Sequence, residues 1–160
     1  MKTTLVAYFS ASGTTARVAE GLAEAIGADL FEIAPVEPYS TADLNWNNRN
    51  SRSSVEMNDE SCRPAIAAEV DDMAAYDTVF VGFPVWWYVE PRIIDTFLEA
   101  YDFSGKTVVP FATSGGSGLG RAPQRMQALA PGAKVLQGGL LNGRFSQAKL
   151  AEWAERALEA

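Results

Sequence analysis

The residues near the N-terminus that are best suited to chemistry are hydroxyl-bearing side chains gathered around one glycine. Gly13 stands among Ser10, Ser12, Thr14 and Thr15, directly after an apolar run and directly before a helical pattern. Hydroxyl groups donate hydrogen bonds, glycine lets the backbone approach a ligand, and the first turn of a helix carries unpaired N–H groups with partial positive charge. This combination predicts a site for a phosphate group.

Other kinds of phosphate loop and a purely structural turn are the alternatives. The turn, which Ala11 completes, has neither the Gly-Lys-Ser/Thr of a Walker loop nor the Gly-x-Gly-x-x-Gly of a dinucleotide site. A terminal monophosphate is therefore the better fit. In the structural alternative, Ser and Thr only cap the helix. Four hydroxyl groups around one glycine exceed what capping needs, so we favour the phosphate site.

Three successive aromatic residues form the second candidate segment. They follow the apolar run 78–83, and they cannot all enter a core from one turn. We expect at least one ring to lie on or beside a flat ligand, whereas the alternative is that both tryptophans pack against neighbouring helices. The segment comprises Pro84, Val85, Trp86, Trp87 and Tyr88.

A glycine-rich turn after the apolar run 107–113 is the third candidate segment. Its bare backbone groups can approach the edge of a flat ligand, and the alternative is a merely flexible turn. Its glycines do not follow the Gly-x-Gly-x-x-Gly spacing, so they do not indicate a second nucleotide site. The turn includes Ser114, Gly115, Gly116 and Gly118.

The composition excludes several classes of chemistry and of partner. The chain carries 13 basic and 20 acidic residues, a net charge of −7, which argues against nucleic-acid binding. Histidine is absent and cysteine occurs once, as Cys62, so imidazole catalysis, His-ligated metals, disulfides and cysteine-ligated clusters are not expected. Cys62 reads as a loop thiol without a redox role. Redox chemistry would have to come from a bound cofactor.

Apolar patterns alternate between strand and helix along the chain. We predict strands at 3–9, 29–34, 78–83, 107–113 and 134–140, and helices at 14–26, 64–75, 91–101, 120–129 and 146–158. This order gives a single domain over residues 1–160, an α/β fold with a doubly wound, five-stranded parallel sheet. Such sheets bind ligands beyond the carboxyl ends of their strands, which is where all three candidate turns lie.

The polar stretch 35–64 has no clear periodicity, and long segments of this kind in compact domains are often functional. It holds Trp46 among Asn and Asp residues. We expect Trp46 either to cover a bound cofactor or to pack locally. The longest apolar stretch, 79–89, is interrupted by glycine and proline and is too short for a bilayer. The first strand leaves no room for a signal peptide, so we expect a cytoplasmic protein without membrane partners.

Taken together, the three turns resemble those of the flavodoxin family, and the similarity covers nearly the whole chain. Members bind flavin mononucleotide (FMN) with a first turn of the type Thr/Ser-x-Thr/Ser-Gly-x-Thr, which residues 10–15 match. The resemblance implies strand order 2-1-3-4-5, a cofactor phosphate on residues 10–15, a flavin ring along 84–88, and contacts to its other edge from 114–118. The turn after 107–113 lacks the aromatic residue typical of flavodoxins, so one flavin face is either open or closed by Trp46.

The resemblance implies a redox protein, and we favour a low-potential electron carrier with redox proteins as partners and a flavoprotein reductase as donor. No Lys or Arg lies in the three turns, which leaves negative charge on a reduced flavin uncompensated. The alternative is an NAD(P)H-dependent quinone or flavin reductase, in which Arg49, Arg52 or Arg121 would meet the phosphates of the nicotinamide cofactor. A receiver-type signalling domain would need acidic residues where Ser10 and Pro84 stand.

Overall fold

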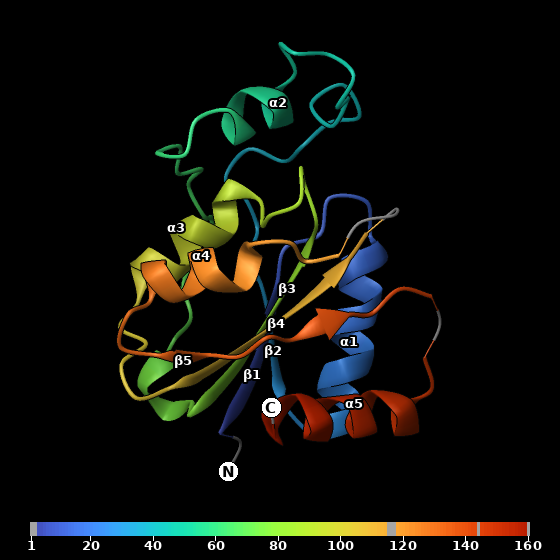
Figure 1. Ribbon diagram of the computed structural model, residues 1–160, viewed down its shortest axis with the longest axis vertical. Helices are drawn as coiled ribbons and strands as arrows, with labels where there is room; N and C mark the ends of the chain where they lie inside the picture. Colours follow the sequence, from blue (N-terminus) through green and yellow to red (C-terminus); the bar gives the residue numbers. More distant parts are fainter. Residues whose placement is uncertain (1–2, 115–117, 144, 160) are drawn as a thin grey trace.

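Strands and helices alternate along most of the chain, as the apolar patterns predict (Figure 1). The computed structural model describes residues 3–114, 118–143 and 145–159. The strands are β1 (Thr4–Tyr8), β2 (Asp29–Glu32), β3 (Thr78–Pro84), β4 (Thr107–Thr113), β5 (Lys134–Val135) and β6 (Gly139–Leu140). The helices are α1 (Thr14–Ile26), α2 (Arg52–Met57), α3 (Arg92–Ala100), α4 (Ala122–Leu129) and α5 (Gln147–Glu159), with a 3-10 turn, η1, at Met73–Ala75.

The strands form one parallel sheet in the order β2-β1-β3-β4-β5, which confirms the predicted fold class. Helices α1 and α5 cover one face, and α3 and α4 cover the other (Figure 1). The carboxyl ends of β1, β3 and β4 reach the same edge of the sheet, so the three candidate turns leave from one edge.

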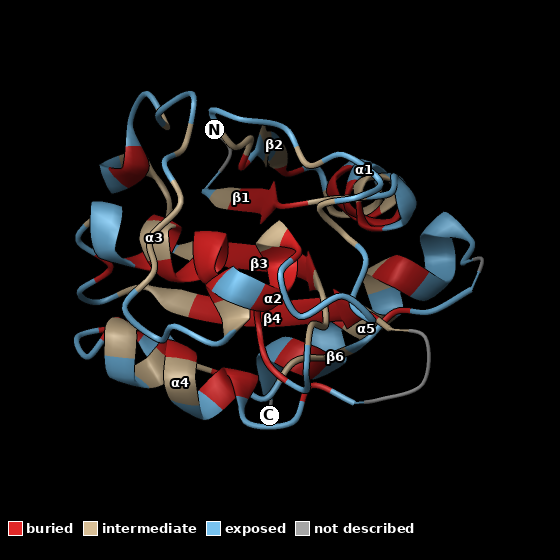
Figure 2. Ribbon diagram, turned by 90° about the horizontal axis from the view of Figure 1, so that it is seen from above, coloured by how far each residue is buried: buried red, intermediate tan, exposed pale blue. Residues whose placement is uncertain are grey.

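Side-chain alternation along the central strands supplies a core to each face. In β1, Leu5 and Ala7 enter the cluster under α3 and α4, whereas Val6 and Tyr8 enter the cluster under α1 and α5. All four are buried, as are most residues of the inner strands (Figure 2). Such two-sided burial explains why these strands read as continuous apolar runs. Packing against both cores also fixes the positions of the strand ends relative to one another.

The predicted fifth strand, 134–140, is wrong as one continuous element. It is divided into β5 and β6, and both pair with β4 in parallel. The break faces Pro110, which has no N–H to give to a neighbouring strand. Opposite it, Gly138 adopts a left-handed φ of 66°, and a Cβ there would come within 1.8 Å of the Pro110 carbonyl oxygen. Only glycine fits this close approach.

The predicted helix 64–75 is also wrong. Of that range only η1 is helical, and the preceding chain is extended, with Val36 N–H donating to Ala65 O and Ala67 N–H donating to Ala34 O. These cross-chain hydrogen bonds replace the helical ones. Conversely, α2 lies within the stretch 35–64, for which no helix is predicted. We refer to residues 35–64 as the insertion; Figure 1 shows it beyond the carboxyl ends of the strands.

Within the described ranges, no helix is both long and apolar enough to cross a membrane.

Candidate functional site

Helix α1 begins without a side-chain cap, at the turn predicted to hold phosphate. Its N-cap residue is Gly13, with a left-handed φ of 93°, and its first turn contains no acidic residue. The leading N–H groups of the helix therefore have no side-chain cap to compete with a ligand. Ser12, Gly13 and Thr14 are exposed around them. An uncapped helix start surrounded by neutral donors is chemically suited to an anion.

Two of the predicted phosphate-binding hydroxyl groups make hydrogen bonds inside the protein. The Gly13 N–H donates to Ser10 Oγ at 3.0 Å, which holds the turn together. Thr15 is 2% exposed, and its Oγ1 lies 2.8 Å from Oγ1 of Thr113 at the end of β4. Thr15 therefore joins the first turn to the third, and Ser12 and Thr14 are the side chains that face outward. Ala11 is half-buried beside them.

The aromatic segment forms a tight two-residue turn. Trp86 and Val89 pair through both backbone hydrogen bonds, and Trp87 and Tyr88 at the tip have left-handed φ angles of 50° and 67°. This geometry is that of a type I′ turn, which usually requires Asn and Gly. A Cβ on Gly120 would lie 2.1 Å from the Tyr88 carbonyl oxygen, so the turn packs directly on the backbone before α4.

The three aromatic residues have different surroundings. Trp86 is half-buried, and its ring meets Phe9 and Tyr39 edge to face at centroid distances of 5.6 and 5.5 Å. Trp87 and Tyr88 are 45% and 69% exposed. The turn thus presents two aromatic side chains to solvent and directs the third inward.

The predicted turns share a cavity at the sheet edge, which we call the turn cavity. It has a volume of about 320 Å³ and is lined by Ser12, Thr14, Pro84, Val85, Trp86, Thr113, Ser114 and Asn142. Trp87, Tyr88 and Gly118 are not among its lining residues, and the predicted contacts Gly115 and Gly116 lie outside the described residues. The structure therefore brings together residues of all three turns, with Trp86 as the aromatic wall.

Asn142 is a lining residue that sequence reasoning missed. Its Oδ1 accepts a hydrogen bond from the Ser114 N–H at 2.9 Å, which fixes the start of the third turn. Asn142 follows β6, at the same sheet edge as the other turns. A polar residue two positions after the predicted strand 134–140 is the signal that could have found it, but the prediction of one continuous strand obscured where β6 ends.

Trp46 lies in a separate cavity on the other side of the first turn, which we call the insertion cavity. Its volume is about 850 Å³, and its lining residues are Ala11, Ser12, Tyr39, Thr41, Ala42, Leu44, Asn45 and Trp46. The two cavities share Ser12 and differ in every other lining residue. The structure therefore places Trp46 beside the predicted phosphate turn but not among the walls formed by the second and third turns.

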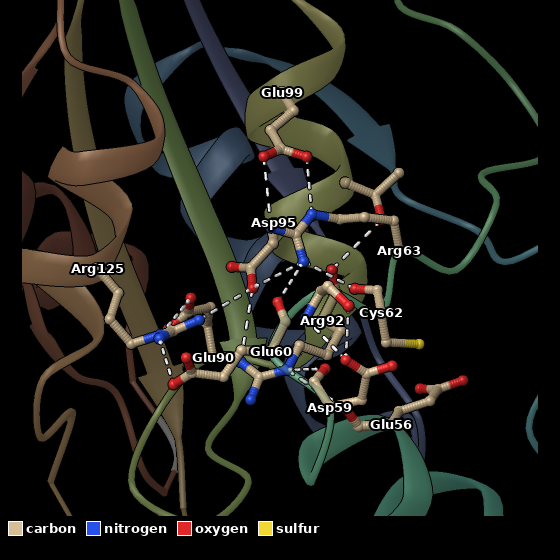
Figure 3. Close-up of polar contacts among 12 residues, drawn as sticks. Glu56, Asp59, Glu60, Cys62, Arg63, Glu90, Arg92, Asp95, Glu99 and Arg125 are labelled. Atoms are coloured by element: carbon tan, nitrogen blue, oxygen red, sulfur yellow. Dashed lines mark hydrogen bonds and ion pairs between the residues drawn. The ribbon is translucent and has the colours of Figure 1, made fainter.

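A partly buried charge cluster fastens the insertion to α3 and α4 (Figure 3). Arg92 is 3% exposed and donates to the backbone carbonyls of Glu56, Met57 and Asp59 at 3.3, 2.9 and 3.2 Å. It thereby caps the end of α2 from another element. Sequence reasoning missed this role, because charge alone does not distinguish a buried arginine from an exposed one.

Two further arginines complete the cluster. Arg125 contacts Glu90 and Asp95 at 3.2 and 3.3 Å, and Arg63 contacts Glu99 at 2.7 Å. Burial raises the pKa of Glu90 to about 9, and the neighbouring Asp95 carboxylate adds to that effect. Glu90 is therefore protonated at neutral pH, which lowers the cost of placing two carboxyl groups side by side in the interior.

None of the candidate basic residues, and not the cysteine either, lines the turn cavity. Arg52 forms an ion pair with Glu56 at 2.9 Å and donates to the Glu37 carbonyl at 2.6 Å, so it is engaged inside the insertion. Arg49 and Arg121 are exposed, but neither lines the turn cavity. Burial raises the pKa of the Cys62 thiol, which disfavours the reactive thiolate.

A family model for flavodoxin matches residues 3–157. The chain belongs to the flavodoxin family. The strand order and the arrangement of helices are those of a flavodoxin-like α/β fold. The turn cavity of this flavodoxin-family chain lies beyond the carboxyl ends of the parallel strands, where doubly wound folds bind their ligands.

Solved structures place the chain among flavoproteins. A protein from Bacteroides eggerthii assigned as a flavoprotein is 50% identical, covers 99% of both chains and superposes with a TM-score of 0.90. A flavoprotein from Lactobacillus acidophilus in complex with FMN is 22% identical over 96% of this chain and 99% of that one, with a TM-score of 0.69. A flavodoxin, WrbA-like protein from Agrobacterium tumefaciens is 18% identical over 99% of both chains, with a TM-score of 0.60. The last two likenesses concern the fold alone. A search of curated proteins found no match.

Proposed function

We propose that the protein binds FMN in the turn cavity and acts as a low-potential electron carrier. The observation that carries this proposal is the uncapped start of α1, which opens beside an uncharged cavity walled by all three turns. The leading N–H groups of α1 with Ser12 and Thr14 would hold the terminal phosphate. Trp86 would contact the flavin, and Ser114 and Asn142 would lie at the polar side of the cavity. When bound, FMN supplies the uptake and release of electrons.

The charge around the cavity supports a carrier over an NAD(P)H-dependent reductase. No Lys or Arg is among the described residues that line the turn cavity, so a further negative charge on the flavin is not compensated there. The same lack leaves the phosphates of NADPH without a cationic partner. With a net charge of −7, the protein would repel NADPH and attract partner proteins with basic surfaces. The exposed side chains of Trp87 and Tyr88 offer apolar contact to such a partner.

The identity of the cofactor is tested by titration. Recombinant protein is expected to be yellow, and cofactor released by heat should be FMN rather than FAD. The first turn suits one terminal phosphate, and no second glycine turn of nucleotide spacing follows it. Apoprotein titrated with each flavin should bind FMN at least tenfold more tightly. Release of FAD, or failure of apoprotein to bind FMN, would refute the assignment.

The carrier role is tested by anaerobic reduction of the bound flavin. We expect NADH or NADPH alone to bleach the flavin negligibly, whereas a flavoprotein reductase bleaches it readily. The rate with the reductase should fall as salt rises from 0.05 to about 0.5 M, because salt screens attraction between opposite charges. Rapid bleaching by either nicotinamide cofactor, with repeated turnover on a quinone, would instead establish the reductase.

A further inference from the structure

The insertion cavity has a lining unlike the rest of this acidic surface. Its described walls contain two aromatic residues, three small or aliphatic ones and three uncharged polar ones, but no charged side chain. Asp43 is the only acidic residue between Tyr39 and Trp46, and its carboxylate accepts a hydrogen bond from the Ser40 N–H instead of lining the cavity. The chain has 20 acidic residues, but none of them is in this described lining. An anion is disfavoured in the cavity mainly because it finds no cationic side chain there to pair with.

Trp46 leaves a large apolar surface open at this cavity. Its side chain is 71% exposed, the greatest exposure among the large hydrophobic residues that the structure describes. Covering an indole ring with another ring removes apolar area from water and adds a stacking contact. Thr41 and Asn45 supply neutral hydrogen-bonding groups around it, while Ser12, which lines both cavities, is assigned to the FMN phosphate. The chemistry of the cavity therefore suits an uncharged aromatic molecule with a polar substituent.

The wall of the cavity is held in place by contacts inside the insertion. The Tyr39 hydroxyl donates to the Glu56 carboxylate, and the Arg52 guanidinium lies 3.8 Å from the centre of the Tyr39 ring. Burial, with the hydrogen bond to Glu56, raises the pKa of Tyr39 far above its ordinary value, so its phenol stays neutral. The segment beyond Tyr39 is closed by reciprocal hydrogen bonds between Ser40 and Asp43. The cavity is thus built before any ligand arrives.

An aromatic pair separates this cavity from the turn cavity. Tyr39 lines the insertion cavity, Trp86 lines the turn cavity, and their rings meet edge to face at 5.5 Å. Phe9 packs against both rings and holds the pair in place. A ligand in one cavity therefore does not need to displace a ligand in the other.

From these observations we propose that the insertion cavity is a second binding site, which takes an uncharged aromatic molecule and stays open when FMN occupies the turn cavity. This inference goes beyond the proposed function, because no ligand other than FMN is part of that function. Trp46 then contacts the second ligand rather than the flavin.

Two probes of equal size and different charge test the proposal. 2-Naphthamide is neutral, whereas 2-naphthoate is an anion at pH 7. Titration calorimetry on the FMN-loaded protein should show saturable binding of 2-naphthamide and binding of 2-naphthoate at least tenfold weaker. Filtration afterwards should leave the flavin absorbance with the protein. Equal binding of the two probes, no binding of either, or release of FMN by 2-naphthamide would overturn the proposal.

Variants with matched controls locate the binding. Trp46→Ala should weaken 2-naphthamide binding about tenfold, through loss of a stacking contact and its buried area, whereas Val55→Ala, at an exposed position of α2, should not change it. Ala42→Glu should abolish binding by placing a carboxylate on the wall, and Val36→Glu, exposed but outside the cavity, should not. If the cavity variants bind like the controls, the probe binds elsewhere and the proposal fails.

The same titration on FMN-free protein separates this proposal from the proposed function. If the protein does not bind FMN at all, that function fails, while binding of 2-naphthamide that depends on Trp46 still supports the second site. If only the FMN-free protein binds the probe, the insertion cavity belongs to FMN and the second site is refuted.

Discussion

At the scale of single residues, the hydroxyl group of Thr15 has a different task from the one that its place in the first turn suggests. It contacts Thr113 Oγ1 in a buried position, and so joins two turns that are far apart in the sequence. A hydroxyl group has one donor and two acceptor sites, but burial limits which of them a ligand can reach. Thr15 therefore acts mainly by holding the first turn against the end of β4, and the exposed Ser12 and Thr14 remain available to an anion.

A double-mutant cycle checks the pairing of these two hydroxyl groups. Thr15→Val and Thr113→Val should each lower the free energy of unfolding by about 1 to 3 kcal/mol, because each leaves one buried hydroxyl without its partner. The double variant should lose clearly less than the sum of the two, since it removes both groups together. Urea unfolding of all four proteins measures this coupling. Strictly additive losses would show that the hydrogen bond contributes nothing.

At the scale of elements, the aromatic turn at Trp87 and Tyr88 stores strain beside the candidate site. Left-handed φ angles are costly for bulky residues, on the order of 1 to 2 kcal/mol each. The turn persists because Trp86 and Val89 are joined by two backbone hydrogen bonds, and because Gly120, which has no Cβ, leaves room for the Tyr88 carbonyl. The strained conformation directs Trp86 inward and leaves the other two rings outside.

Replacing Tyr88 by glycine should stabilise the fold. Glycine adopts the left-handed φ of 67° without a steric penalty, and it is the preferred residue at the second central position of a type I′ turn. We expect Tyr88→Gly to raise the free energy of unfolding by about 0.5 to 1 kcal/mol, measured by urea denaturation, because relief of about 1 to 2 kcal/mol of steric strain exceeds the entropy that glycine adds to the unfolded chain. Tyr88→Ala keeps the Cβ, so it should give no such gain. A gain of equal size in both variants would assign the effect to the ring instead of the backbone.

The sequence predicts the regular elements well and the contacts that shape the site poorly. The helices 14–26, 91–101, 120–129 and 146–158 match α1, α3, α4 and α5 closely, because each carries an apolar stripe that the sheet buries. Helix α2 has no comparable stripe. It depends on Arg92, which belongs to α3 and caps it through three carbonyls. Contacts of this kind leave no periodic signal.

The candidate site shows the same division. Of the predicted residues, those that line the turn cavity come from all three turns, because strand ends of a parallel sheet meet at one edge: Ser12, Thr14, Pro84, Val85, Trp86 and Ser114. Tyr39 and Asn142 could not be predicted, since each reaches a cavity through an irregular segment whose path is set by tertiary hydrogen bonds. The position of Trp46 also follows from that path, which places it beside the first turn and away from the other two.

At the scale of the whole molecule, the charge cluster connects the insertion with the body of the fold. Arg63 and Arg125 reach from different segments to Asp95, at 3.9 and 3.3 Å, and Arg92 lies 3.6 Å from the same carboxylate. Asp95 is fully buried, so removing any one partner leaves charge in a poorly solvated place. The insertion is therefore part of one cooperative structure with α3 and α4.

The protonated Glu90 gives this structure a characteristic pH dependence. Its pKa is about 9 in the folded chain against an ordinary value of 4.5, so the folded state binds its proton more tightly. Stability attributable to Glu90 is then fully present below pH 4.5 and is lost as pH rises through about 9. Glu90→Gln lacks this titration, and its free energy of unfolding should increasingly exceed that of the natural chain between pH 5 and about 9.

Glu99→Gln is the matched control for this experiment. The ion pair with Arg63 lowers the pKa of the half-exposed Glu99, so its own titration affects stability only at acid pH. Its stability curve should stay parallel to that of the natural chain above pH 5. If Glu90→Gln also stays parallel, Glu90 is ionised in the folded protein and the assignment of its proton is wrong.

The pairing of β1 with β3 has a consequence for the time course of folding. Thr4 pairs with Thr78, whereas Thr78 pairs with Thr107 on the next strand. The first strand therefore leaves the ribosome long before β3, its neighbour in the sheet, has been synthesised. The chain between β1 and β3 carries the insertion, and its helix α2 is capped by Arg92 from the later helix α3. Closing the longer loop costs more entropy, so the β1–α1–β2 unit, in which Leu5 pairs with Asp29, and the β3–α3–β4 unit should each assemble before β1 pairs with β3. Pulse-labelled hydrogen exchange during refolding should protect amides that bond within each unit before the amides that bond β1 to β3, and the reverse order would contradict this. The phosphate turn, which belongs to the first unit, would then meet the other two turns of the candidate site only when the two units join.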